Sequence, residues 1–303
     1  MARNRATSSA NRGWSQRIGE NVAVSSPGDH LDAALCRWDC AVDGPAMRGG
    51  MSVVVPVRPS DGSQLMLKLL DLDGATREAL ALRAFPPSAS VRCIDHAVDL
   101  GALLLERLTP VSLAGAPVDE QIIVQARLAR SLAVPAPWQI GRLSGTRLAD
   151  HLNDLLCGAP DLLDGRVIDA ARESLLDVAS DDTATLTHGD LHTINVHKDD
   201  SGHWRVLDPN PHVGTIAFES HTVIVERSRL DEVIRAGGRE LRRRLALFAD
   251  VAEVDQGSAE RFCQSRAVMS APHEQARGAF RLAGDLRWMA EALTPPASVG
   301  SRR

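Results

Sequence analysis

The pattern of apolar positions changes part-way along the chain, from strand-like to helical. Short apolar runs bounded by turn residues predict four strands, at residues 52–57, 64–70, 91–98 and 102–108. Residues 30–42 and 75–85 have the spacing of amphipathic helices instead. The first part of the chain is therefore expected to be a small sheet accompanied by two helices.

The second part of the chain is mainly helical in its pattern. Apolar residues recur at helical intervals in six segments, at residues 118–134, 147–157, 165–179, 235–251, 259–270 and 274–293. Two short strands are expected between them, around residue 196 and at residues 204–207. A β-rich part followed by a helical part predicts an α+β protein with two lobes and a cleft between them.

These patterns set the expected domain limits. Residues 1–25 are predicted to be a flexible N-terminal tail, because their first part is rich in Arg, Asn and Ser and has no apolar centre of the kind a secretion signal needs. Residues 26–107 are expected to form the smaller β-rich N-lobe. Residues 108–303 are expected to form the larger helical C-lobe.

Charge and cysteine content narrow the class of protein. The chain has 34 Lys and Arg against 39 Asp and Glu, a formal net charge of -5, so it has no strong field to attract nucleic acid or an anionic membrane. Its five cysteines are scattered and odd in number, which fits neither a disulfide framework nor a paired zinc motif. We expect a cytoplasmic protein, a monomer or weak dimer, without nucleic-acid or membrane partners.

Polar residues that suit phosphoryl transfer gather between residues 188 and 208. The segment HGDLHTIN at 188–195 contains Asp190 and Asn195, and Asp208 follows an apolar run. A carboxylate that accepts a hydroxyl proton, together with hard oxygen ligands for magnesium, is what transfer from ATP requires. The spacing predicts Asp190 as the catalytic base, and Asn195 and Asp208 as ligands of Mg²⁺.

A lysine in an apolar strand supports the same interpretation. Lys68 lies within the strand at 64–70, where its charge needs a partner or a ligand. Glu78 on the following helix is the obvious partner. The pair is expected to hold the ammonium group against the α- and β-phosphates of ATP.

Short motifs extend this pattern over almost everything after the tail. They are RWD at 37–39, DG at 43–44, SVVVPV at 52–57, DG at 61–62, LKL at 67–69, EALALR at 78–83, LLERL at 104–108, VPAP at 134–137, HGDLHTIN at 188–195, LDPNP at 207–211 with Gly214, and RAVMSA at 266–271. With these motifs the chain resembles the aminoglycoside phosphotransferases, and more closely the streptomycin 6-kinase and hydroxyurea phosphotransferase group.

The resemblance implies a protein-kinase-like fold and a division of labour between its lobes. The linker from Glu106 to Leu108 would hold adenine through backbone groups, and Gly50, Met51 and Ser52 would lie over the phosphates. The implied reaction transfers the γ-phosphate of ATP, with Mg²⁺, to a hydroxyl of an aminoglycoside-type antibiotic, with streptomycin as the leading acceptor. The alternatives are another hydroxylated small molecule (hydroxyurea, a sugar or a nucleoside-like antibiotic) and an inactive nucleotide-binding relative.

The chain departs from the family pattern where an acceptor would be recognised. After residue 214 these kinases commonly continue with Asp-Pro and then an aspartate, whereas this chain has Glu219 in that segment. Thr193 and Ile194 stand where a small residue such as glycine is frequent. His192, Glu219 and Glu226 are the candidate acceptor-facing residues.

The sequence also raises a metal hydrolase as a competing class. Six of the ten histidines fall between residues 188 and 221, and His188 and His192 have the four-residue spacing of a helical metal pair. However, Gly189 and Asp190 between them indicate a loop rather than a helix, and no HExxH glutamate is present. A role for His188 in fixing the loop by hydrogen bonds is the preferred interpretation.

Overall fold

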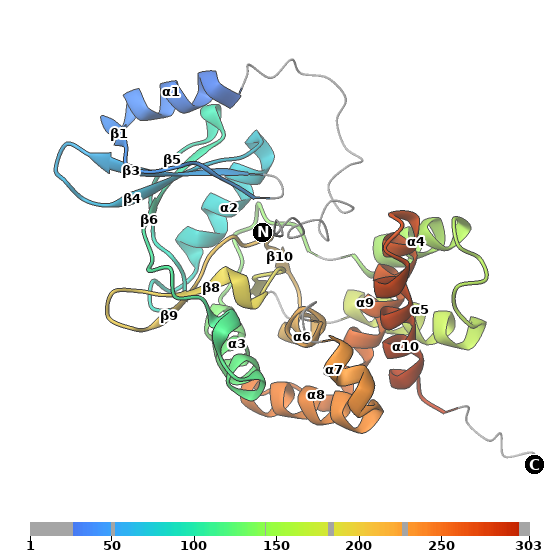
Figure 1. Cartoon of the computed structure of the whole chain (residues 1–303). Coiled ribbons are helices and arrows are strands. Elements are labelled where there is room, and N and C mark those ends of the chain that lie inside the picture. Colours follow the sequence, from blue (N-terminus) through green and yellow to red (C-terminus); the bar gives the residue numbers. More distant parts are fainter. Residues whose placement is uncertain (1–26, 50–51, 143, 181–184, 226–229, 297–303) are drawn as a thin grey trace, which may run out of the picture. The chain divides into compact units, whose positions relative to one another are not determined.

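The computed structural model describes residues 27–49, 52–142, 144–180, 185–225 and 230–296 (Figure 1). Contacts between these residues divide the chain into two compact units. The first unit contains the described residues up to Val111, together with His197–Asp208. The second contains Ser112–Val196 and the described residues from Pro209 onward.

The first unit is built on a six-stranded antiparallel sheet. Its strands are β1 (Cys40–Val42), β2 (Met47–Arg48), β3 (Val53–Pro59), β4 (Leu65–Leu69), β5 (Cys93–Ala97) and β6 (Ala102–Glu106). They are ordered β1-β3-β4-β6-β5, and β2 pairs with β3. The four strands expected from the sequence correspond to β3, β4, β5 and β6. The two helices α1 (Pro27–Arg37) and α2 (Leu72–Ala84) lie on opposite sides of the sheet (Figure 1).

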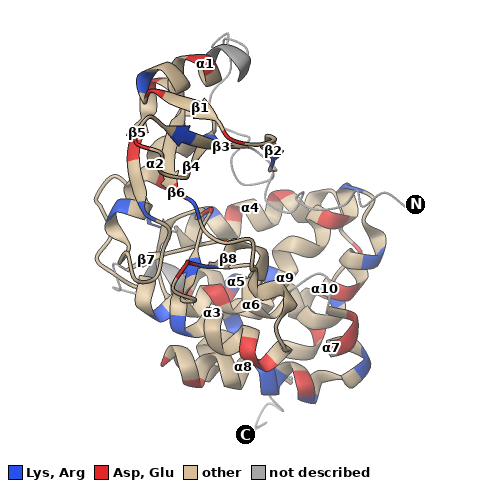
Figure 2. Ribbon diagram, turned by 60° about the vertical axis from the view of Figure 1, so that its left-hand side comes forward, with Lys and Arg blue, Asp and Glu red and all other residues tan. Residues whose placement is uncertain are grey.

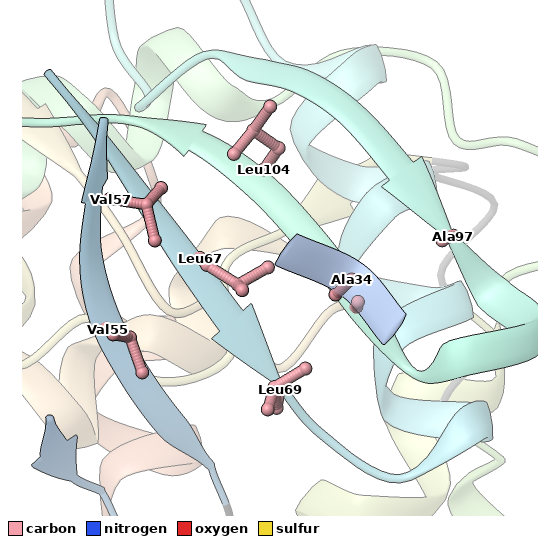
Figure 3. Close-up of a cluster of buried hydrophobic side chains, with 8 residues drawn as sticks. Ala34, Val55, Val57, Leu67, Leu69, Ala97 and Leu104 are labelled. Atoms are coloured by element: carbon pink, nitrogen blue, oxygen red, sulfur yellow. The ribbon is translucent and has the colours of Figure 1, made fainter. Parts of the chain in front are cut away.

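Alternation along the strands decides which side chains form the core of this unit. Val55, Val57, Leu67 and Leu69 share one face of the sheet and pack with Ala34 of α1 (Figure 3). Because neighbouring side chains in a strand point to opposite faces, Lys68 lies on the face away from this cluster. That orientation directs the lysine toward α2.

The first helix ends earlier than expected from the sequence. The prediction of a helix over residues 30–42 is wrong at its C-terminal end, because α1 stops at Arg37 and Asp39 takes a left-handed conformation with φ 47°. Residues 40–42 then form β1, in which Cys40 pairs with Pro59 of β3. Pairing with the sheet therefore overrides the helical spacing of this segment.

The second unit consists mainly of helices. They are α3 (Val118–Leu132), α4 (Gly145–Cys157), α5 (Gly165–Ser180), α6 (Ser220–Ile224), α7 (Leu230–Ala236), α8 (Gly238–Ala252), α9 (Gln256–Ala276) and α10 (Phe280–Leu293). Helix α9 packs against α5, α6, α8 and α10. Acidic and basic residues are interspersed along α7, α8 and α10 (Figure 2). None of the described helices is long and apolar enough to span a bilayer.

The last two helices divide at a different point from the one expected. We predicted a break near residue 272, but Pro272 lies inside α9 and is buried. The helix ends instead at Ala276, and Gly278 follows with φ 75°, a left-handed conformation suited to glycine. Packing of Ala271 and Pro272 in the interior offsets the hydrogen bond that proline cannot donate.

A hairpin late in the sequence belongs to the first unit. Strands β8 (Val196–Lys198) and β9 (Trp204–Val206) pair with each other. The amide of Val91 donates to the carbonyl of Val206 at 2.8 Å, and the amide of Thr109 donates to that of Lys198 at 2.9 Å. These backbone bonds place residues 197–208 with the sheet unit, whereas the sequence analysis had assigned them to the C-lobe.

Candidate functional site

The centre of the first unit's polar site is the ammonium group of Lys68. Its Nζ atom lies 2.7 and 2.5 Å from the two carboxylate oxygens of Glu78, and 2.5 Å from Oδ1 of Asp208. Lys68 and Glu78 are almost fully buried, whereas the side chain of Asp208 is 47% exposed. Strand β4, helix α2 and the segment after β9 therefore bring together three residues that the sequence analysis had singled out.

This cluster brings one ammonium group close to two carboxyl groups. Burial raises the pKa of Glu78 to about 7; the neighbouring charge of Asp208 adds to the rise and that of Lys68 opposes it. Burial alone would lower the pKa of Lys68, but the two carboxylates outweigh it and the pKa is raised. The carboxylate of Asp208, which is open to solvent, favours the approach of a cation.

The backbone at Asp208 is unusual for a residue other than glycine. Its φ of 62° lies in the left-handed region. Aspartate and asparagine tolerate this conformation better than most residues, because their short polar side chains interact with nearby backbone. An Asp-to-Asn change at this position is therefore compatible with the local backbone.

In the second unit, the loop that contains Asp190 is held by hydrogen bonds to its own residues. The side-chain amide of Asn195 donates to the backbone carbonyl of Asp190 at 2.9 Å and to Oδ2 at 3.2 Å. The Nε2 atom of His192 lies 3.4 Å from Oδ1 of the same aspartate. Asp190 and His192 are both about a quarter exposed at the side chain, so the carboxylate is oriented yet reachable. Both bonds are made by the nitrogen of the Asn195 amide.

Gly189 allows this loop to pass close to a neighbouring segment. Its φ is 78°, and a Cβ atom there would lie 2.0 Å from the carbonyl oxygen of Asn210. The strands β7 (Leu186–Thr187) and β10 (His212–Val213) pair next to this point, which explains the close approach. Glycine is therefore required by both conformation and space.

Glu219 lies beneath the loop. It is 2% exposed, and its Oε1 atom accepts a hydrogen bond of 2.6 Å from the amide of Gly189. Burial raises the pKa of Glu219, while the bond from Gly189 and the charge of Arg266 oppose the rise. This position suits a residue that holds the loop. The segment in which this chain departs from the family pattern thus contains Glu219, which contacts the loop.

Arg266 on α9 is a residue to which the sequence analysis gave no role. Burial lowers its pKa, and the charges of Glu219 and Asp190 act in the opposite direction. Its guanidinium carbon lies 4.8 Å from the centre of the Phe218 ring, within the range of a cation–π contact. Arg266 thus supplies a positive charge near two carboxylates, that of Asp190 on the loop and that of Glu219 beneath it. Arg266 is the first residue of the RAVMSA motif, which does not indicate a function for it.

The remaining candidate residues lie in the linker, before β3 or outside the described residues. Glu106 ends β6, and Leu108 follows in the linker. The carbonyl of Ser52, just before β3, accepts a hydrogen bond of 2.9 Å from the amide of Gly49. Three candidates lie outside the described residues, namely Gly50, Met51 and Glu226.

His188 contacts the backbone of its own loop. Nδ1 of His188 accepts a hydrogen bond of 3.3 Å from the amide of Asp190, in line with the expected role of His188 in fixing the loop. Within the described ranges, no group of three or more His, Cys, Asp and Glu side chains is arranged to hold a metal ion. Ile194, which follows in the same loop, is 49% exposed and presents an apolar side chain there.

Comparison with known families decides between the competing classes. A model of the aminoglycoside/hydroxyurea antibiotic resistance kinases matches residues 37–278. The chain belongs to this family. The resemblance drawn from the short motifs is thereby confirmed. So is the expected enzyme class, a phosphotransferase with an alcohol group as acceptor.

Individual relatives within the family are moderately similar. The hydroxyurea phosphotransferase of Kitasatospora aureofaciens is 35% identical over 214 residues, which cover 66% of this chain and 61% of that protein. The streptomycin 6-kinase of Streptomyces glaucescens is 26% identical over 272 residues, which cover 87% of this chain and 88% of that protein. Neither identity is high enough to transfer an acceptor.

Solved structures confirm the fold. A thermostable mutant of aminoglycoside phosphotransferase APH(4)-Ia, in a ternary complex with AMP-PNP and hygromycin B, aligns with a TM-score of 0.58 at 13% identity and covers 91% of this chain and 100% of that chain. The GDP complex of aminoglycoside 2'-phosphotransferase-IIIa aligns with a TM-score of 0.55 at 12% identity and covers 89% of this chain and 99% of that chain. The expected α+β, protein-kinase-like architecture is therefore correct.

Proposed function

We propose that this protein transfers the γ-phosphate of ATP to a hydroxyl group of a small antibiotic-like molecule. The observation that carries the proposal is the buried Lys68 ammonium group, held between Glu78 and Asp208. A buried ion pair with a second, exposed carboxylate is costly unless it serves a ligand. Phosphate groups match the positive charge of Lys68, and their metal ion matches the exposed carboxylate of Asp208.

On the nucleotide side, Lys68 and Glu78 have separate tasks. Lys68 donates hydrogen bonds to phosphate oxygens, and Glu78 keeps its ammonium group in place. The linker at Glu106 and Leu108 holds the base, and the segment of Gly50, Met51 and Ser52 covers the phosphates.

Asp208 and Asn195 are the proposed ligands of a magnesium ion. Asp208 provides an exposed carboxylate and Asn195 an amide oxygen, which are hard ligands of the kind Mg²⁺ prefers. When bound, the ion would neutralise charge on the phosphate oxygens. Its charge also offsets that of the Asp208 carboxylate beside Lys68.

On the acceptor side, Asp190 orients the attacking hydroxyl group and takes its proton. The new bond joins the hydroxyl oxygen to the terminal phosphorus, the bond from that phosphorus to the bridging oxygen breaks, and ADP leaves. Asn195 and His192 fix the carboxylate, and Glu219 fixes the backbone before it. A direct acceptor contact by His192 or Glu226 is part of the proposal, whereas the burial of Glu219 supports a positioning role.

We also propose a domain organisation and a cellular location for the protein. Residues 26–107 would form the nucleotide-binding lobe, and residues 108–303 would supply the catalytic loop and the acceptor site, with the 197–208 hairpin as an exception. We place the enzyme in the cytoplasm, where ATP is available, as a monomer or weak dimer.

Streptomycin and hydroxyurea are the acceptors to test first, because relatives named for both resemble the chain. Purified protein would be incubated with MgATP and each compound, alongside a panel of sugars and nucleosides. We expect one class of compound to gain the mass of a phosphoryl group. If ATP binds and no hydroxylated compound is modified, the inactive nucleotide-binding alternative is favoured.

Asp208→Asn should weaken the binding of magnesium nucleotide. The change removes one metal-binding charge but keeps the left-handed backbone, so we expect at least about a tenfold increase in the Kd for MgATP. Titration calorimetry with and without Mg²⁺ measures this effect. Binding of ATP in excess EDTA is the control and should change much less. An equal change under both conditions would contradict the metal role.

A further inference from the structure

The carboxylate of Asp43 holds two guanidinium groups, one of them from the linker. Nη1 of Arg107 donates to Oδ2 of Asp43 at 3.0 Å. Arg58 on β3 contacts both oxygens, with Nη2 at 3.2 Å from Oδ1 and 3.0 Å from Oδ2, and Nε at 3.3 Å from Oδ1. Asp43 itself is fixed, because its amide donates to the carbonyl of Pro56 at 2.8 Å.

The same linker is held at both of its ends. At its start, the amide of Glu106 donates to the carbonyl of Arg92 at 2.9 Å, and Oε2 of Glu106 accepts from the amide and from Nε of Arg92, each at 3.1 Å. At its end, the amide and hydroxyl of Thr109 both donate to the carbonyl of Lys198, at 2.9 and 2.8 Å. Between these points, the side chain of Arg107 is tied to Asp43.

We propose that Asp43 is a positioning residue for nucleotide binding, acting through Arg107 on the linker backbone. This inference rests on the proposed function, in which that linker holds the base. Arg107 directs its side chain to Asp43, which leaves the backbone on either side of it in one conformation. A linker already fixed before binding loses less conformational freedom when the nucleotide arrives, and this increases affinity.

The exposure of these residues separates this role from a purely structural one. The side chains of Asp43, Arg107 and Arg58 are 25, 34 and 40% exposed. Ion pairs this close to solvent contribute little to folding, so breaking one should leave the unit folded. Its effect on a preorganised linker would then be visible mainly in nucleotide affinity.

The test compares three single variants by direct titration of MgATP, without need of an acceptor. Asp43→Asn and Arg107→Gln each break the bond to the linker and should raise the Kd by about three- to tenfold, a change typical of one charge-assisted hydrogen bond. Arg58→Gln keeps the Asp43 to Arg107 bond and should have a smaller effect. The Asp43→Asn, Arg107→Gln double variant should be no worse than either single variant, because both remove the same interaction.

Asp95→Asn is the matched control, since Asp95 accepts a bond from Trp38 at 2.8 Å on the same sheet and does not touch the linker. It should leave the Kd unchanged. Unchanged affinity in Asp43→Asn and Arg107→Gln, additive effects in the double variant, or a fall in Tm with normal affinity would overturn the positioning role alone. Failure of the unsubstituted protein to bind MgATP would overturn the proposed function as well.

Discussion

Asp190→Asn is expected to lower kcat for acceptor phosphorylation by about 100- to 10,000-fold, the range contributed by a positioned acid or base. The reason is that an amide cannot take the hydroxyl proton, although it has nearly the same shape. The Asn195 bonds to the backbone carbonyl and to Oδ2 can both persist. Steady-state kinetics with a saturating acceptor measure the loss.

Nucleotide affinity provides the control for this variant. Lys68, Glu78 and Asp208 are all unaltered in this variant, so the Kd for MgATP should change less than in Asp208→Asn. The same Asp-to-Asn change is thus expected to lower kcat at Asp190 and to weaken nucleotide binding at Asp208. Near-normal turnover in Asp190→Asn would contradict its catalytic assignment.

Gly189→Ala is expected to disrupt the loop that contains Asp190. The added methyl group would lie 2.0 Å from the Asn210 carbonyl oxygen and 2.9 Å from Nδ1 of His212, in a conformation that already disfavours alanine. The backbone must move, so the bond from the Gly189 amide to Glu219 should be lost. We expect a cost of about 2 to 4 kcal/mol in unfolding free energy, typical of strain combined with overpacking, and a severe loss of kcat/KM.

Gly278→Ala separates the effect of backbone strain from the effect of a steric clash. Gly278 lies in the same unit with φ 75°, close to the 78° of Gly189, and a Cβ atom there would meet nothing within 4 Å. The control should lose only about 1 kcal/mol and keep its activity. Urea unfolding of both variants gives the comparison. Equal losses in the two variants would mean that the contact with Asn210 is unimportant.

Much of the Lys68 cluster could be predicted from sequence, because its signals are local. Lys68 interrupts an apolar strand, and the next helix offers one well-placed carboxylate in Glu78; the structure joins the two. The third member, Asp208, was predicted only as a metal ligand. Its bond to Lys68 depends on the 197–208 hairpin returning to the first unit, which no periodicity in the sequence indicates.

The support of the loop that contains Asp190 was not predictable in the same way. Glu219 lies 30 residues after Gly189, and their hydrogen bond depends on tertiary packing. The sequence showed Glu219 only as a departure from a family pattern. Arg266 is still further along the chain, on a helix whose period gives no sign of a charge close to Asp190. Pattern reasoning identified the loop but not the residues beneath it.

The central claim is that these residues form a working phosphoryl-transfer site. The most direct measurement follows ADP formed and phosphorylated acceptor in the same reaction, by mass spectrometry, with the protein, Asp190→Asn and a magnesium-free control run in parallel. We predict equal amounts of the two products from the unsubstituted protein, and little of either from both comparisons. ADP released without a phosphorylated acceptor, or equal product from Asp190→Asn, would contradict the account.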